Sequence, residues 1–172
     1  MDRPLEQLLS SDQLSARVVE LGREVRGWYP PGATITAVGV LKGSFVFMAD
    51  LVRAVDGPVA IEFLGVSSYV GTDSSGAVQI TQDLRVDVSG KHVLLIEDIV
   101  DTGLTLEYLL RIMAARNPAS LRVVALLDKP SRRKVEVPVD LVGFEIPDLF
   151  VVGYGLDLDQ LHRNLPYIGV FR

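Results

Sequence analysis

The chain has 172 residues, of which 48% are hydrophobic and 23% are charged, and its formal net charge at pH 7 is −5. This length suits one domain with a sizeable core, spanning residues 1–172, and the weak acidic balance argues against nucleic acid as a partner. The absence of cysteine excludes disulfide frameworks and thiolate metal sites, and no apolar run has the length of a membrane span or a signal peptide. We therefore expect a cytoplasmic protein without a membrane partner.

Strand and helix patterns alternate through the first part of the chain. Apolar residues at helical spacing after a capping sequence predict a helix over residues 10–27, and a second helix is predicted over residues 45–55. Between them, β formers predict a strand over residues 34–40. The turn after this strand holds Lys42 and Gly43, which could bind pyrophosphate, although a single loop lysine is more often merely solvated.

A further strand is predicted over residues 59–66, and β formers return at residues 78–81. The residues between them, 70–76, are rich in turn formers and poor in core formers, which favours a hairpin loop. The alternative is a lid, because mobile polar loops beside phosphate sites commonly close over a substrate.

The rest of the chain is organised around a strand, a turn and a helix. The unbroken apolar run of residues 93–96 is typical of a strand buried on both faces, and apolar residues at helical spacing from Leu106 onward predict the helix. The turn between them holds three carboxylates, Glu97, Asp98 and Asp101. Carboxylates suit sugar hydroxyls, a metal ion or a proton in transfer.

The same turn offers an anion site. A helix that starts near Thr102 presents unpaired backbone N–H groups and the positive end of its dipole. Gly103 allows a ligand to approach the backbone closely, and the hydroxyls of Thr102 and Thr105 add hydrogen-bond donors. A phosphate cradle with acids beside it indicates a sugar phosphate as the ligand.

Acids at the start of a helix are also ordinary caps and dipole partners. That simpler account covers Asp101 well. It covers Glu97 and Asp98 poorly, because they follow a buried strand directly, and ligands bind at this end of the strands in open α/β sheets.

A strand is also predicted over residues 121–127, closely followed by Lys129. The position of Lys129 after a buried strand sets it apart from the next basic residues. Those residues, Arg132, Arg133 and Lys134, are interpreted as a solvated loop.

Residues 140–157 predict a strand, a proline turn, a second strand and a glycine-rich turn with an acid. Phe150 within this stretch would be a core residue by default. Taken with the earlier segments, the alternation of strands and helices predicts an α/β fold with a largely parallel central sheet flanked by helices.

Residues 96–105, Ile-Glu-Asp-Ile-Val-Asp-Thr-Gly-Leu-Thr, resemble the phosphoribosyl pyrophosphate signature of the type I phosphoribosyltransferases, most closely in the hypoxanthine-guanine branch. Residues 140–157 are a second strong match, and the resemblance extends over residues 34–170. It implies that family's fold, with a small hood over the base site built from the N-terminal helix and part of residues 129–172. It also implies a homodimer or a homotetramer.

The activity that the resemblance implies is transfer of 5-phosphoribosyl from 5-phosphoribosyl 1-pyrophosphate to N9 of a 6-oxopurine, with Mg²⁺ as cofactor. In this scheme Glu97 and Asp98 hold the ribose hydroxyls and, with Asp157, belong to the metal site. Asp101 is the candidate catalytic residue, which accepts or shares the N7 proton of the purine. The other implied sites are the ribose and phosphate loop, with Asp101, Thr102, Gly103, Leu104 and Thr105; the pyrophosphate site, with Lys42, Gly43 and Arg163; the purine site, with Lys129, Phe150, Val151 and Asp157; and the lid, with Ser68 and Tyr69.

Two other classes of protein and one neighbouring specificity stay open. A regulator that kept this fold but binds nucleic acid would need a basic face or an added domain, and a chain of 172 residues with charge −5 favours neither. A Rossmann-type nucleotide module would need a glycine-rich turn that no strand here precedes. An enzyme that prefers xanthine is the nearer alternative. Lys129 favours a 6-oxo group over the 6-amino group of adenine because lysine only donates, and nothing ranks hypoxanthine against guanine.

Overall fold

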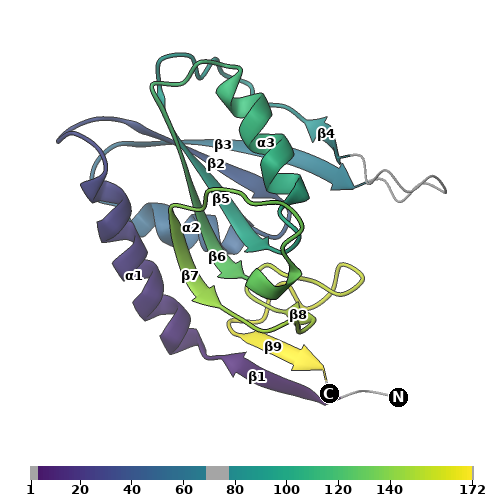
Figure 1. The fold of residues 1–172 in the computed structure, drawn as a ribbon. Coiled ribbons are helices and arrows are strands. Elements are labelled where there is room, and N and C mark those ends of the chain that lie inside the picture. Colours follow the sequence, from purple (N-terminus) through teal and green to yellow (C-terminus); the bar gives the residue numbers. More distant parts are fainter. Residues whose placement is uncertain (1–3, 69–77, 172) are drawn as a thin grey trace.

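The computed structural model describes residues 4–68 and 78–171. Their order confirms the predicted α/β fold class, with most element ends within one or two residues of the expected positions (Figure 1). The elements are β1 (Leu5–Leu9), α1 (Ser11–Gly27), β2 (Ile35–Leu41), α2 (Phe45–Ala54), β3 (Val59–Ser68), β4 (Val78–Gln82), β5 (His92–Val100), α3 (Leu104–Ala114), β6 (Ser120–Asp128), a 3₁₀ turn (Pro130–Arg132), β7 (Leu141–Glu145), β8 (Val151–Val152) and β9 (Ile168–Phe171).

The main sheet has the strand order β4-β3-β2-β5-β6-β7, and every neighbouring pair in it is parallel except β3 and β4. From the central pair β2 and β5 the chain winds outward in opposite directions, to β3 on one side and to β6 on the other. Ligands of open α/β sheets bind at the carboxyl ends of the two strands where the winding direction changes. The topology therefore places a candidate site beyond the ends of β2 and β5.

Helices cover both faces of this sheet. In Figure 1, α1 and α2 lie on one side of it and α3 lies on the other. Alternate residues of β5 serve the two layers: Leu94 and Ile96 pack in the core cluster with α1 and α2, whereas Val93 and Leu95 pack in the cluster with α3. All four are buried, so the prediction of a strand buried on both faces is confirmed. In the described part of the chain, no helix is both long and apolar enough to cross a membrane.

The predicted first helix begins with a capping box. The Ser10 hydroxyl accepts a hydrogen bond from the Gln13 N–H at 3.2 Å, and the Gln13 side chain accepts one from the Ser10 N–H at 2.9 Å. This reciprocal pair satisfies backbone donors that the helix leaves free at its start. The apolar face of α1 then packs against α2.

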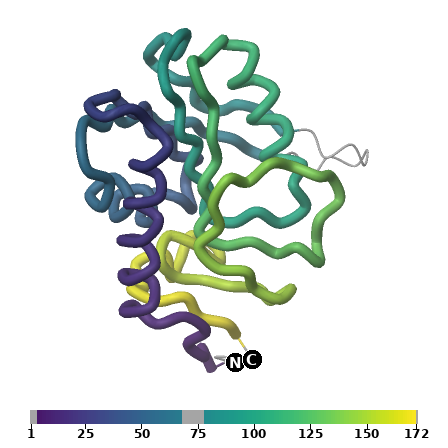
Figure 2. The backbone as a smooth tube through the Cα atoms, turned by 60° about the vertical axis from the view of Figure 1, so that its left-hand side comes forward, coloured from purple at the N-terminus to yellow at the C-terminus, as the bar shows by residue number. Residues whose placement is uncertain are grey.

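A second, three-stranded sheet has the order β1-β9-β8 and is antiparallel. Figures 1 and 2 both place β1 beside β9, and Figure 1 shows this sheet beyond the carboxyl ends of β6 and β7. Neither β1 nor β9 was predicted from the sequence. The hood over a base site stays a prediction. If there is such a hood, the three strands of this small sheet belong to it, because they lie beyond the carboxyl ends of β6 and β7.

The predicted hairpin is borne out by its strands, because β3 and β4 pair antiparallel through Val66 with Ile80 and Ser67 with Gln79. Ser68, one of the two predicted lid residues, is the last residue of β3. Tyr69, the other, lies outside the described residues, as does the connection over residues 69–77.

The close packing of α1 on α2 can be tested at Gly22, where an added Cβ atom would lie 2.5 Å from the carbonyl oxygen of Ala54. We expect Gly22→Ala to force the helices apart and to lower the free energy of unfolding in urea by about 1–3 kcal/mol. Gly27→Ala is the matched control, because a Cβ atom there meets nothing within 4 Å. Equal stability of the two variants would contradict this packing.

Candidate active site

A cavity of about 280 Å³ lies at the point where the topology places a site. Its walls come from the ends of β2 and β5, from the start of α3 and from the loop after β8. Many of the residues predicted from the sequence line this one cavity: Lys42, Gly43, Glu97, Asp98, Asp101, Thr102, Gly103, Thr105, Asp157 and Arg163. Segments that are more than a hundred residues apart in the chain therefore meet at one place.

Glu97 and Asp98 belong to β5 and not to the turn in which the sequence analysis placed them. The strand runs on to Val100 because its backbone keeps pairing with β6, up to Val100 opposite Asp128. Glu97 is consequently buried, with only 6% of its surface exposed, and Asp98 is partly buried. An extended backbone points the two side chains in different directions, so each meets a different part of the surroundings.

Burial sets the acid–base properties of these two carboxyl groups. It raises the pKa of Glu97 well above the ordinary value for glutamate, and the neighbouring charge of Asp98 raises it further. Burial also raises the pKa of Asp98 to about 6, although a hydrogen bond from the Ile99 N–H at 2.7 Å favours its charged form. Burying two neighbouring carboxylates lowers the stability of the fold unless a cation or hydrogen-bond donors contact them.

Close backbone packing holds Asp98 against the loop after β2. A Cβ atom at Gly43 would lie 1.5 Å from a carboxylate oxygen of Asp98, so a side chain at Gly43 cannot coexist with this arrangement. Gly155 has φ +102, and a Cβ atom there would lie 2.2 Å from the Gly43 carbonyl oxygen. The peptide bond between Leu41 and Lys42 is cis. The loop after β2 thus meets strand β5 and the loop after β8 at contacts that only glycine permits.

Two cations, Lys42 and Arg163, line the same cavity as the acids. Arg163 forms an ion pair with Asp157 at 2.8 Å and donates to the Gly155 carbonyl oxygen at 2.7 Å. The Lys42 ammonium and the Arg163 guanidinium each donate to the side-chain oxygen of Gln160 at 3.2 Å. Gln160 was missed in the sequence analysis, because neither its residue type nor its place in a loop marks it as functional.

The start of α3 opens onto the cavity. The helix begins at Leu104, two residues later than predicted, with Gly103 as its N-cap at φ +87. The Thr102 hydroxyl accepts a hydrogen bond from the Leu104 N–H at 3.4 Å, and Thr102 and Thr105 both line the cavity. Leu104, which the resemblance placed in the phosphate loop, does not line the cavity and is 38% exposed.

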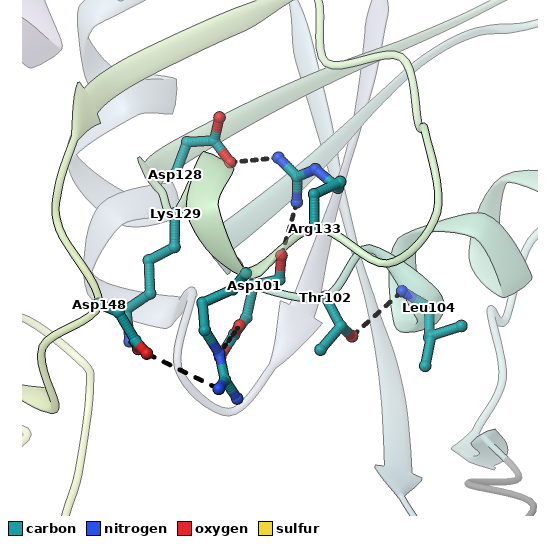
Figure 3. A network of polar contacts seen from close by, with 8 residues as sticks. Asp101, Thr102, Leu104, Asp128, Lys129, Arg133 and Asp148 are labelled. Carbon is teal, nitrogen blue, oxygen red and sulfur yellow. Dashed lines mark hydrogen bonds and ion pairs between the residues drawn. The ribbon is translucent and has the colours of Figure 1, made fainter.

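The interpretation of the basic residues after Lys129 as solvated is wrong for Arg133, whereas Arg132 and Lys134 are exposed as expected. Figure 3 shows Arg133 between Asp128 and Asp101, where its side chain is 14% exposed. It forms an ion pair with the Asp128 carboxylate and donates to the Asp101 backbone oxygen at 2.8 Å. Arg132, which is more exposed, donates to the Asp101 carboxylate at 3.1 Å. Sequence reasoning could not find these contacts because they depend on β6 ending beside the start of α3.

The residues predicted for purine binding lie outside the lining of this cavity, apart from Asp157. Lys129 is buried, and its ammonium lies 3.8 Å from the Asp148 carboxylate (Figure 3). Val151 is buried in β8, whereas Phe150 is 58% exposed and is therefore not the core residue that its type suggests by default. An exposed phenylalanine ring is available to stack on a ligand.

No group of three or more His, Cys, Asp or Glu side chains able to hold a metal ion occurs within residues 4–68 and 78–171. Magnesium, however, is usually held through one or two carboxylates together with water and substrate phosphates. Asp98 and Asp157 suit that arrangement, because both line the cavity and the charge of Asp157 raises the pKa of Asp98. The donor set fits Mg²⁺ in the company of a phosphate ligand.

Comparison with known proteins agrees with this geometry. Residues 6–159 match the family model described as the phosphoribosyl transferase domain. The chain is 54% identical over 168 residues to the hypoxanthine phosphoribosyltransferase of Haemophilus influenzae, covering 96% of this chain and 94% of that protein. It is 49% identical over 166 residues to the hypoxanthine-guanine phosphoribosyltransferase of Bacillus subtilis, covering 96% and 92%. The fold matches the crystal structure of a hypoxanthine-guanine phosphoribosyltransferase from Bacillus anthracis with TM-score 0.93 and 42% identity, covering 99% and 100% of the two chains.

The burial of Asp98 has a measurable consequence for stability. A carboxyl group whose pKa is raised in the folded state weakens folding as the pH rises from about 4 to above 6. In chelator and without ligand, we expect Asp98→Asn to be more stable than the wild type at pH 8, by on the order of 2 kcal/mol. The difference should shrink as the pH approaches 4, in urea denaturation at a series of pH values.

Asp83 is the control for this measurement. Burial alone would raise its pKa, but hydrogen bonds from the Arg116 side chain and the Leu84 N–H outweigh burial and lower it. Asp83→Asn should therefore be less stable than the wild type at pH 8. A loss of stability in both variants at pH 8 would show that the charged Asp98 carboxylate does not destabilise the fold.

Proposed function

The chain belongs to the phosphoribosyl transferase family, and on this premise we propose that it is a purine salvage enzyme that makes IMP, GMP or both. It transfers 5-phosphoribosyl from 5-phosphoribosyl 1-pyrophosphate to N9 of hypoxanthine or guanine and releases pyrophosphate. One observation carries the proposal. A helix N-terminus with two threonines, two neighbouring acids of which one is buried and one partly buried, and two cations line a single cavity, and these are the groups that a phosphorylated, diphosphate-bearing ribose requires.

The ribose phosphate lies along β5 and the start of α3 in this proposal. The backbone N–H groups from Thr102 to Thr105 bind the 5′-phosphate, with the helix dipole in their favour. Glu97 and Asp98 accept hydrogen bonds from the ribose hydroxyls. Their negative charge also stabilises the positive charge that develops at the anomeric carbon as the bond to pyrophosphate breaks.

The leaving pyrophosphate lies between Lys42, the Gly43 backbone and Arg163. Lys42 and Arg163 bind its oxygens and stabilise the charge that they gain. Asp98 and Asp157, with Glu97 beside them, are the residues that would hold Mg²⁺. Bound Mg²⁺ supplies further neutralisation of the leaving group.

The purine is placed over Asp101, on the side of the loop where Lys129 is buried. Asp101 accepts or shares the N7 proton, which makes N9 the nucleophile. Lys129 donates to the oxygen at position 6, the Phe150 ring stacks on the base, and the Val151 backbone meets the base edge. In the free protein, Lys129 contacts Asp148 instead, so the base displaces a weak ion pair at 3.8 Å.

The remaining features of the proposal are a lid, an assembly and a location. Ser68 and Tyr69 belong to a lid that excludes water, since water would hydrolyse the activated donor. The protein forms a homodimer or homotetramer in the cytoplasm. Light scattering on the purified protein measures the assembly directly.

A panel of bases tests the activity. The protein is mixed with 5-phosphoribosyl 1-pyrophosphate and Mg²⁺, and in turn with hypoxanthine, guanine, xanthine and adenine, and nucleotide formation is followed. We expect turnover with hypoxanthine, guanine or both, lost on adding a chelator, and little with adenine. Preference for xanthine would replace the specificity proposed here. Absence of turnover with every base, while the donor still binds, would favour a sensor on the same fold.

The proton role of Asp101 predicts a specific kinetic pattern. Asp101→Asn keeps the size of the side chain but removes the proton acceptor, so kcat should fall by about 10²–10⁴. The KM for 5-phosphoribosyl 1-pyrophosphate should change much less. Asp56→Asn, which alters an exposed carboxylate in the turn after α2, is the control and should leave kcat unchanged. An unchanged kcat in Asp101→Asn would remove Asp101 from the proton chemistry.

A further inference from the structure

We propose that Gln160 is a positioning residue for the pyrophosphate site. Its side-chain oxygen holds Lys42 and Arg163 together before the donor binds and keeps both contacts when the diphosphate arrives. This role rests on the proposed function, in which Lys42 and Arg163 bind the leaving pyrophosphate.

The contacts of Gln160 single it out. Its amide oxygen accepts hydrogen bonds from the Lys42 ammonium and from the Arg163 guanidinium, each at 3.2 Å. Two cations that share one acceptor are close enough to repel each other, and the amide dipole offsets part of that repulsion. The arrangement keeps both side chains near the position that a diphosphate would need, before the diphosphate arrives.

The direction of approach leaves the site free. Lys42 and Arg163 line the main cavity and also a neighbouring cavity of about 370 Å³ beside β3 and β4. Gln160 lines only this neighbouring cavity. It therefore holds the cations from the side away from Glu97 and Asp98, and their other donors stay available to an anion in the main cavity.

The backbone at Gln160 adopts a left-handed conformation that is unfavourable for glutamine. Leu158 and Leu161 exchange hydrogen bonds of 3.2 and 2.9 Å across a tight turn, and the Gln160 N–H donates to the Asp157 carboxylate at 2.8 Å. Within the turn, Asp159 has φ +51 and Gln160 has φ +68, a region that favours glycine or asparagine. A turn chosen only for its shape would not place glutamine there.

The chemistry of a neutral amide suits this positioning role. A carboxylate at this position would form ion pairs with both cations and would compete with the charged diphosphate for them. A neutral amide oxygen positions the cations without neutralising their charge, which stays available to the diphosphate.

The decisive variant is Gln160→Gly, which removes the amide while relieving the left-handed backbone. We expect its melting temperature to stay equal to that of the wild type or to rise. The KM for 5-phosphoribosyl 1-pyrophosphate should rise about 5- to 20-fold, with kcat and the KM for the purine within about twofold of the wild type. Gln160→Glu should raise the donor KM further, because the new carboxylate competes with the diphosphate.

Asp159→Gly is the matched control. It relieves the same kind of backbone strain one residue earlier, and it removes a negative charge, which could only favour an anionic ligand. Its donor KM should therefore not rise. A donor KM that is unchanged in Gln160→Gly would overturn the role of Gln160, and so would a fall in its melting temperature with equal losses for donor and purine.

Direct binding separates this role from the proposed activity. Calorimetry with Mg²⁺ pyrophosphate on the full chain needs no turnover, and we expect Gln160→Gly to bind it about 5- to 20-fold more weakly than the wild type. Equal affinity would contradict the role of Gln160 even if the enzyme is active. Failure of the wild type to turn over any purine would contradict the proposed function but leave this comparison intact.

Discussion

The site depends on two adjacent carboxylates at the end of the central strand. Because β5 keeps pairing with β6 beyond Glu97 and Asp98, these acids lie at the edge of the core. Burial there raises the pKa of both. In the described part of the chain, the contacts of neither carboxylate offset the cost of burying its negative charge. The glycine that admits Asp98, the acid and arginine of the loop after β8, and the helix start beside them are all arranged around this charge.

Topology explains why cations and acids from distant parts of the chain meet here. The winding of the main sheet reverses between β2 and β5, so the loops after these two strands face each other across a gap. The loop after β2 brings Lys42, and β5 brings the acids. The antiparallel pairing of β8 with β9 then holds the loop with Asp157 and Arg163 at the same place.

Much of this site could be predicted from sequence, because position at the end of a buried strand is a strong signal for ligand contact. Glu97, Asp98, Lys42 and the threonine-rich turn were found in that way, and the family resemblance is confirmed by the comparisons. The strands β1 and β9 were not found, because each is short and the two pair with each other from opposite ends of the chain. Local pattern carries no information about such a partner.

The contacts of charged loop residues were likewise beyond the sequence. A basic residue in a loop is usually solvated, and only the folded chain places Arg133 between Asp128 and Asp101. The central claim is that the charged forms of Glu97 and Asp98 are unfavourable in the free protein and become favourable when the ligand and its cation bind. ¹³C NMR titration of the Asp98 carboxyl group tests this claim most directly. In the free protein this group should titrate near the pKa of about 6 that its burial dictates. With 5-phosphoribosyl 1-pyrophosphate and Mg²⁺ bound, it should titrate at a clearly lower pH. A pKa unmoved by the ligand would contradict the account.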